Sequence, residues 1–206
     1  MNNGKAREIV TNGLFKNNPI LVQVLGICST LAVTNVLKNT VVMCVALIFV
    51  CGFSSGMVSL LRKLIPMRVR MMAEIMIAAT GVILVDIILK AHLPDVSRQL
   101  GPYVGLIITN CIVMGRCEAF ALSNPPWQSL LDGVSNAGGY SLVLLAIAVV
   151  RELLGSGSLW GVKIMGDWWT NWSIMVMAPG GFFVLAVMLW ITKGIFSKTE
   201  EDTKHA

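Results

Sequence analysis

The sequence predicts an all-α integral membrane protein with six transmembrane helices, arranged as two inverted three-helix repeats whose first helices, the first and fourth of the chain, are interrupted at the bilayer midplane. The composition, six charge-poor segments and a repeated Pro–Cys pattern support this prediction. Of the 206 residues, 55% are hydrophobic and only 13% are charged, whereas an average soluble domain has about 25% charged residues. The mean hydropathy is +0.75. A soluble fold of this size could not cover its surface with so few charges.

The net charge of +5 does not indicate nucleic-acid binding. A nucleic-acid interface needs Lys and Arg clustered on one face, whereas here they lie in short connections between apolar segments. Such residues orient a membrane protein, because cytoplasmic connections are enriched in Lys and Arg. With the amino terminus inside, the 16 basic residues divide eleven to five in favour of the inside. We therefore expect both termini in the cytoplasm.

Six segments are predicted to cross the membrane. They are residues 19–37, 39–61, 71–89, 99–115, 133–150 and 168–192. A helical span needs about 20 residues, and these runs lack the alternation of a β-barrel, the other structure that satisfies its backbone in lipid. The first and fourth are short and contain Thr, Asn, Pro and Gly. The whole chain, 1–206, forms one membrane domain, with repeats at about 17–92 and 99–196.

The repeat is defined by a proline nine residues before a cysteine. Pro19 precedes Cys28 and Pro102 precedes Cys111, with an offset of 83 residues for both members. Three spans in each half invert the second half relative to the first, as in many transporters. Nine helical residues rise roughly 13–14 Å, about half of the 30 Å hydrocarbon layer. Both thiols are therefore predicted at the midplane.

A buried cysteine is more often a packing residue than a ligand, and we assign Cys44, Cys51 and Cys117 to packing. The symmetric placement and polar neighbours of Cys28 and Cys111 favour a metal site for this pair. Two thiolates suit iron–sulfur or zinc, and iron–sulfur clusters normally need four cysteines. The site would then be incomplete, and a second subunit, most simply a homologue with the same repeat, would supply the other two thiolates.

Ionisable residues at membrane depth are candidates for an ion path. Glu74, Asp86 and Asp132 lie near the ends of predicted spans, so a solvated interfacial role remains open for each; Asp86 is one turn before Lys90. Arg116 and Glu118 follow the Cys111 helix, and we interpret them as an ion pair that tunes or anchors a cofactor. No catalytic residue is predicted.

Four segments resemble one known family. They are LGICSTLAVTN, VGLIITNCIVMGRCEAFA, DGVSNAGGY and RELLGSGSLWG. They are similar to the D subunit of the Na+-translocating NADH:quinone oxidoreductase and to its homologue, the E subunit of the Rnf-type ferredoxin:NAD+ oxidoreductase. The similarity runs over about 10–196. The motif TNCIVMGR-x-EAFA is highly specific, and LVDIILKAHLPDVSRQL favours the first enzyme.

The resemblance implies a six-subunit complex in the bacterial inner membrane that passes electrons from NADH to a quinone and drives Na+ outward. NADH, the flavins and the quinone would lie on other subunits. The chain would pair with a homologous sister, the E subunit of the same enzyme, in the opposite orientation. Cys28 and Cys111 match the cysteines that share an iron centre, or [2Fe-2S] cluster, with two from the sister. Cys117 departs from the family, where alanine is expected.

Two further functions also fit the sequence. Inverted repeats are found in secondary ion transporters without redox chemistry, and a purely structural subunit would need no metal. Iron content distinguishes the transporter from the redox relay. With a purely structural subunit, quinone reduction would persist after Cys28 and Cys111 are both replaced by alanine. The E subunit of the Rnf-type complex remains the alternative within the family.

Overall fold

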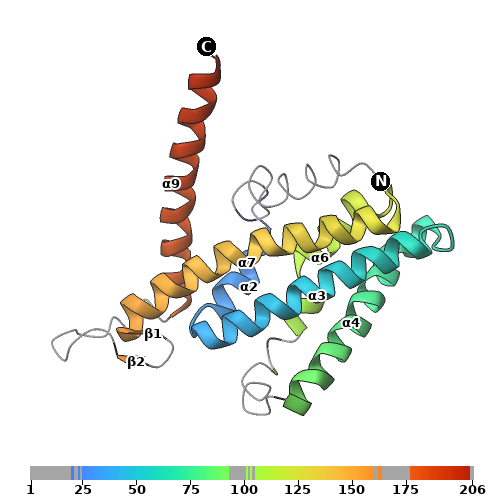
Figure 1. The fold of residues 1–206 in the computed structure, drawn as a ribbon, viewed down its shortest axis with the longest axis horizontal. Helices are drawn as coiled ribbons and strands as arrows, with labels where there is room; N and C mark the ends of the chain where they lie inside the picture. The colour runs from blue at the N-terminus through green and yellow to red at the C-terminus, as the bar shows by residue number, and fades with distance from the viewer. Residues whose placement is uncertain are drawn as a thin grey trace.

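The structure of the protein is a computed structural model, which describes residues 20, 23, 25–92, 101, 103, 105–159, 162–163 and 177–204. The elements follow one another along the chain as shown in Figure 1. They are α2 (Ile27–Val33), α3 (Leu37–Leu61), the 3-10 turn η2 (Met67–Val69), α4 (Arg70–His92), α6 (Cys111–Arg116), the π-helix η3 (Cys117–Ala121), α7 (Pro126–Ser156), β1 (Ser158–Leu159), β2 (Val162–Lys163) and α9 (Ala178–Lys204). The two short strands pair antiparallel.

Within the described ranges, three helices are long and apolar enough to cross a membrane: α3, α4 over Arg70–Ala91, and α7 over Pro126–Gly155. They confirm the second, third and fifth predicted spans as continuous helices. The predicted sixth span is represented by an apolar stretch of α9, Pro179–Gly194. The first and fourth contain the short helices α2 and α6, and their prolines lie outside the described residues.

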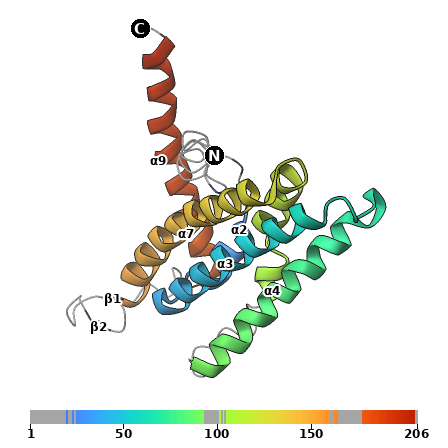
Figure 2. The same ribbon diagram turned by 45° about the vertical axis from the view of Figure 1, so that its right-hand side comes forward.

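The antiparallel helices α3 and α7 lie side by side in both views (Figures 1 and 2), and small residues allow them to approach closely. A Cβ on Gly133 of α7 would lie 2.9 Å from the Cys51 backbone oxygen and 2.8 Å from the Ser55 hydroxyl, and one on Gly52 of α3 would lie 2.7 Å from Val134. Close backbone approach through small residues is a common way for helices to associate in lipid. The small residues on the facing sides of α3 and α7 therefore allow the two backbones to approach closely.

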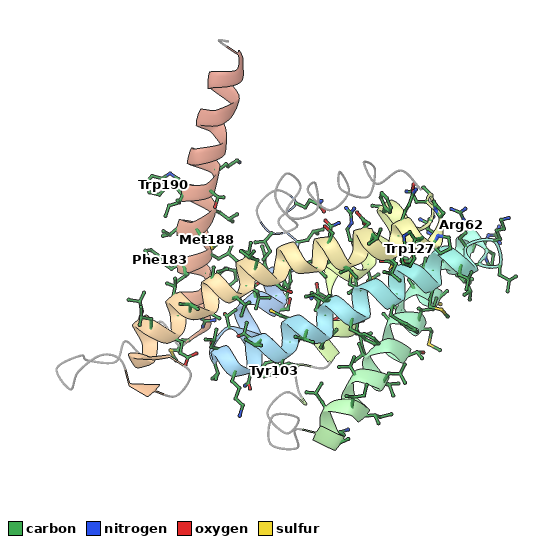
Figure 3. All side chains as sticks on the ribbon, viewed as in Figure 1. Arg62, Tyr103, Trp127, Phe183, Met188 and Trp190 are labelled. Atoms are coloured by element: carbon green, nitrogen blue, oxygen red, sulfur yellow. The ribbon has the colours of Figure 1, made fainter. Side chains whose placement is uncertain are left out.

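The other long helices leave apolar side chains on the outside. One face of α4, including Ala78 and Val82, is buried, while its opposite face exposes residues such as Met72 and Met76. Helix α9 extends away from the α3–α7 pair, and its Phe183 and Trp190 point outward (Figure 3). Exposed apolar faces on long helices suit contact with lipid or with other transmembrane helices.

Polar contacts at both ends of α7 fix the connecting segments. Near its start, Arg62 of α3 donates to the Asn124 carbonyl oxygen at 3.0 Å, and Arg62 and Trp127 lie at the same end of the helix pair (Figure 3). Near its other end, the buried Arg151 donates to the Thr34 hydroxyl at 2.6 Å and to the Leu31 carbonyl at 3.1 Å. The charge pattern predicted Arg151 in a connecting segment, but it is a buried residue of α7.

Replacing Gly133 with alanine is expected to lower the melting temperature of the purified protein in detergent, because the added methyl group must push α3 and α7 apart. Overpacking of this kind costs typically about 1–3 kcal/mol. Gly138→Ala is the matched control, since no described atom lies within 4 Å of its added Cβ, and it should leave the melting temperature unchanged or slightly raised. Equal melting temperatures would contradict the close α3–α7 contact.

Candidate functional site

The first cysteine lies just after a backbone turn that only glycine adopts readily. Gly26 precedes α2 with φ 78°, a left-handed conformation that disfavours side chains. A Cβ there would also lie 2.7 Å from the Tyr140 ring and 3.1 Å from Ile112. Helix α2 begins at the next residue, so Cys28 is the second residue of a seven-residue helix.

The second cysteine also follows a break. Residues 105–108 are helical, the chain leaves the helix at Thr109 and Asn110, and α6 begins at Cys111. The Asn110 side chain accepts a hydrogen bond from the Ile112 backbone N–H at 3.1 Å. It therefore satisfies one of the unpaired donors of the new helix, as asparagine does at many helix starts.

Hydrogen bonds join the two breaks. The Asn110 amide donates to the Ser29 hydroxyl at 3.2 Å, and the Ser29 and Tyr140 hydroxyls lie 2.5 Å apart. Tyr140 also donates to the Gly26 carbonyl oxygen at 3.0 Å. Ser29 follows Cys28 and Asn110 precedes Cys111, and adjacent Cα atoms are about 3.8 Å apart. The network therefore brings the backbones that hold the two cysteines together.

The five cysteines fall into two groups by exposure. Cys28 and Cys111 are exposed, whereas Cys44, Cys51 and Cys117 are buried. Cys117 lies against α3, with its sulfur 3.3 Å from the Ser54 hydroxyl. The three buried residues agree with the predicted packing role.

Two accessible thiols fit a soft metal by the chemistry of their donor atoms. The part of the chain that the structure describes contains no cluster of three or more His, Cys, Asp or Glu side chains suited to a metal ion. Two thiolates leave the four-cysteine requirement of a common iron–sulfur cluster half met. Cys28 and Cys111 therefore supply two of the four thiolates that such a cluster requires.

The predicted ion pair between Arg116 and Glu118 is wrong. Arg116 binds Asp132 of α7 through two parallel hydrogen bonds of 2.8 and 2.6 Å, while Glu118 pairs with Arg70. Residues two apart on a helix do not face each other, which explains the error. Asp132 also accepts from the Asn136 amide at 3.0 Å, so it belongs to a buried polar cluster.

The remaining acidic residues differ in their surroundings. Asp86 pairs with Lys90 at 2.6 Å, one helical turn away, as the spacing indicated. Glu74 is only 2% exposed, and neither of its carboxyl oxygens has a hydrogen-bond partner among the described residues. Arg70, one helical turn before Glu74 on α4, forms its ion pair with Glu118.

Tyr140 was missed by sequence reasoning, although it ends the quoted motif DGVSNAGGY. The side chain is 1% exposed and contacts the first turn of α2, 114 residues earlier in the chain. A tyrosine in a glycine-rich apolar helix was the available signal, because a buried phenol usually needs a polar partner.

Long apolar helices and a buried polar network between helix breaks define this protein as a polytopic helical membrane protein. Residues 6–189 match the family described as "Rnf-Nqr subunit, membrane protein". The chain belongs to this family.

Several relatives are named as the D subunit of a Na(+)-translocating NADH-quinone reductase. The one from Tolumonas auensis is 42% identical, over 98% of this chain and 96% of the relative. Relatives from Pseudomonas aeruginosa strain PAO1 and Psychromonas ingrahamii are 47% and 46% identical, over 89% and 91% of this chain and 84% and 91% of their own lengths.

Asp132→Asn is expected to destabilise the protein strongly, because it leaves the guanidinium of Arg116, whose side chain is 15% exposed, without its counter-charge. Breaking a buried pair costs on the order of 3 kcal/mol. Glu118→Gln breaks the more exposed pair with Arg70 and should cost less than about 1 kcal/mol. Unfolding in detergent, followed by circular dichroism, measures both. A larger loss of stability from Glu118→Gln than from Asp132→Asn would show that the exposed pair contributes more to stability than the buried one.

Proposed function

We propose that this chain is the D subunit of a Na+-translocating NADH:quinone reductase, a membrane component of that complex. It relays electrons across the bilayer through an iron centre, or [2Fe-2S] cluster, shared with a homologous sister subunit, and this transfer is coupled to Na+ export. The observation that supports the relay best is the pair of exposed cysteines at two hydrogen-bonded helix starts. The names of the relatives support the assignment to the complex.

The proposed architecture has six spans in two inverted repeats, in the bacterial inner membrane with both termini in the cytoplasm. It is supported by the matching positions of the two breaks, since Cys28 and Cys111 each lie in the first turn of a short helix. Inversion would bring the two helices towards the midplane from opposite faces, and repeat-interface sites of this kind are common in transport proteins.

The sister subunit, in the opposite orientation, would contribute the other two thiolates. The iron centre, when bound, would accept and release single electrons. Cys28 and Cys111 would hold it as thiolates, and Ser29 and Asn110 would fix their backbones. NADH, the flavins and the quinone would bind to other subunits. The same chemistry suits the homologous E subunit of an Rnf-type complex, which differs in the electron donor and is distinguished by its partners in the assembly.

Cys28→Ala and Cys111→Ala, each made in the purified complex, are expected to lower its iron content by the amount that one centre contributes, because three thiolates hold a four-thiolate centre poorly. Cys44→Ala is the matched control, since Cys44 is buried in the α3–α7 contact and should retain iron. Iron is measured by plasma mass spectrometry relative to protein.

Undiminished iron in a variant that carries both Cys28→Ala and Cys111→Ala would place the iron on other subunits. A wild-type complex without iron would remove the redox relay altogether and leave a redox-free ion transporter as the better function. Matching losses from Cys44→Ala would contradict the assignment to Cys28 and Cys111.

Five ionisable residues are candidates for the Na+ path or for tuning of the centre. Three of them, Asp86, Arg116 and Asp132, are paired within or between helices, as is Glu118. Glu74 alone among the five has no ion-pair or hydrogen-bond partner in the described residues. A buried carboxylate without a partner is costly, so a transported cation is the counter-charge that we propose for it. The four paired residues would tune or anchor their surroundings.

Glu74→Gln is expected to raise the Na+ concentration needed for half-maximal quinone reduction several-fold, because the amide keeps the shape but removes the negative charge. Iron content should not change. Glu118→Gln is the comparison variant, because its carboxylate is paired with Arg70, and its effect on the Na+ dependence should be smaller. Identical Na+ dependence in Glu74→Gln and wild type would exclude Glu74 from the ion path.

A further inference from the structure

Tyr140 is anchored by the first turn of α2. Its hydroxyl lies 3.0 Å from the Gly26 carbonyl oxygen, 2.5 Å from the Ser29 hydroxyl and 3.3 Å from the Thr30 hydroxyl. Its ring fills the space where a side chain on Gly26 would stand. The tyrosine therefore fixes both the turn that precedes Cys28 and the residue that follows it.

The same network reaches α6 through one shared hydroxyl. The Ser29 hydroxyl accepts a hydrogen bond from the Asn110 side-chain amide at 3.2 Å, and the Asn110 side-chain oxygen Oδ1 accepts from the Ile112 backbone N–H at 3.1 Å. A continuous path of hydrogen bonds thus runs from Tyr140 of α7 to the residues on both sides of Cys111. All of its side chains are buried, where hydrogen bonds are not weakened by water.

We infer that Tyr140 is a positioning residue that sets the separation and orientation of the Cys28 and Cys111 thiols. The inference deepens the proposed function and rests on it for the identity of the metal. Replacing a residue that orients metal ligands without binding the metal itself commonly lowers the metal affinity. Tyr140 has this role without touching the metal, because it acts through Ser29 and Asn110.

The hydroxyl protons of this network have two complete arrangements. In one, Tyr140 donates to the Gly26 oxygen and Ser29 donates to Tyr140. In the other, Tyr140 donates to Ser29, and Ser29 donates to the Gly26 oxygen at 3.1 Å. Both satisfy every hydroxyl group, so the O–H dipoles can reverse without movement of heavy atoms. Hydrogen bonding around an iron–sulfur centre is one of the factors that set its reduction potential.

The test compares Tyr140→Phe with Tyr103→Phe in the purified complex. Phenylalanine keeps the ring volume at both sites, and the structure records no hydrogen bond of the partly buried Tyr103 side chain among the described residues. Tyr140→Phe is expected to release iron to a chelator about 10-fold faster and to lower the midpoint potential of the iron centre. Tyr103→Phe should match wild type in both measurements.

A second measurement does not depend on iron. In membranes that contain the full chain, oxidative cross-linking of Cys28 to Cys111 reports the relative placement of the two thiols. Its yield should fall in Tyr140→Phe and in Ser29→Ala, and the double variant should fall little further, because both side chains belong to one network. If Tyr140→Phe does not assemble into the complex, Ser29→Ala tests the same hydrogen-bond network by the same cross-linking measurement.

Unchanged iron release, potential and cross-linking in Tyr140→Phe would overturn the positioning role, as would equal changes in Tyr103→Phe. A wild-type complex that lacks iron but shows the cross-linking difference would refute the proposed function and leave the positioning role supported.

Discussion

The close contact between α3 and α7 is the constraint on which the rest of the structure depends. Gly133 brings the two backbones together because any side chain there would strike the Cys51 carbonyl. In lipid, the hydrophobic effect does not drive helices together, so close packing between them must supply the stabilisation. The contact holds α7 at a fixed position, and the polar side chains of α7 then meet the short helices at defined places.

Three positions along α7 show this effect. Asp132 binds Arg116 at the end of α6, Tyr140 binds the start of α2, and Arg151 binds the end of α2. The short helices have too few residues to be stable alone, so these contacts to α7 hold them in place. Helix α7 therefore positions α2 and α6, which carry Cys28 and Cys111, although α7 itself carries neither cysteine.

The sequence predicted what depends on local pattern. Long apolar segments indicated α3, α4 and α7, and the repeated Pro–Cys pattern indicated the two cysteines that the structure exposes. It missed contacts that depend on which faces meet after folding. Arg116 pairs with Asp132 rather than Glu118 because α6 continues into a π-helix and residues two apart diverge. Tyr140 was missed because its partners lie 114 residues away, and a single sequence does not indicate that contact.

The exposure of the two thiols has a physical consequence for assembly. A neutral thiol is tolerated beside lipid, but a thiolate that holds a metal is charged, and charge at membrane depth is strongly unfavourable. Cys28 and Cys111 are exposed in this chain, although the polar groups behind them are buried. If they act as thiolates, another protein surface must cover them before the metal is held stably. Metal binding and subunit association would then be a single coupled step, in which neither proceeds far without the other.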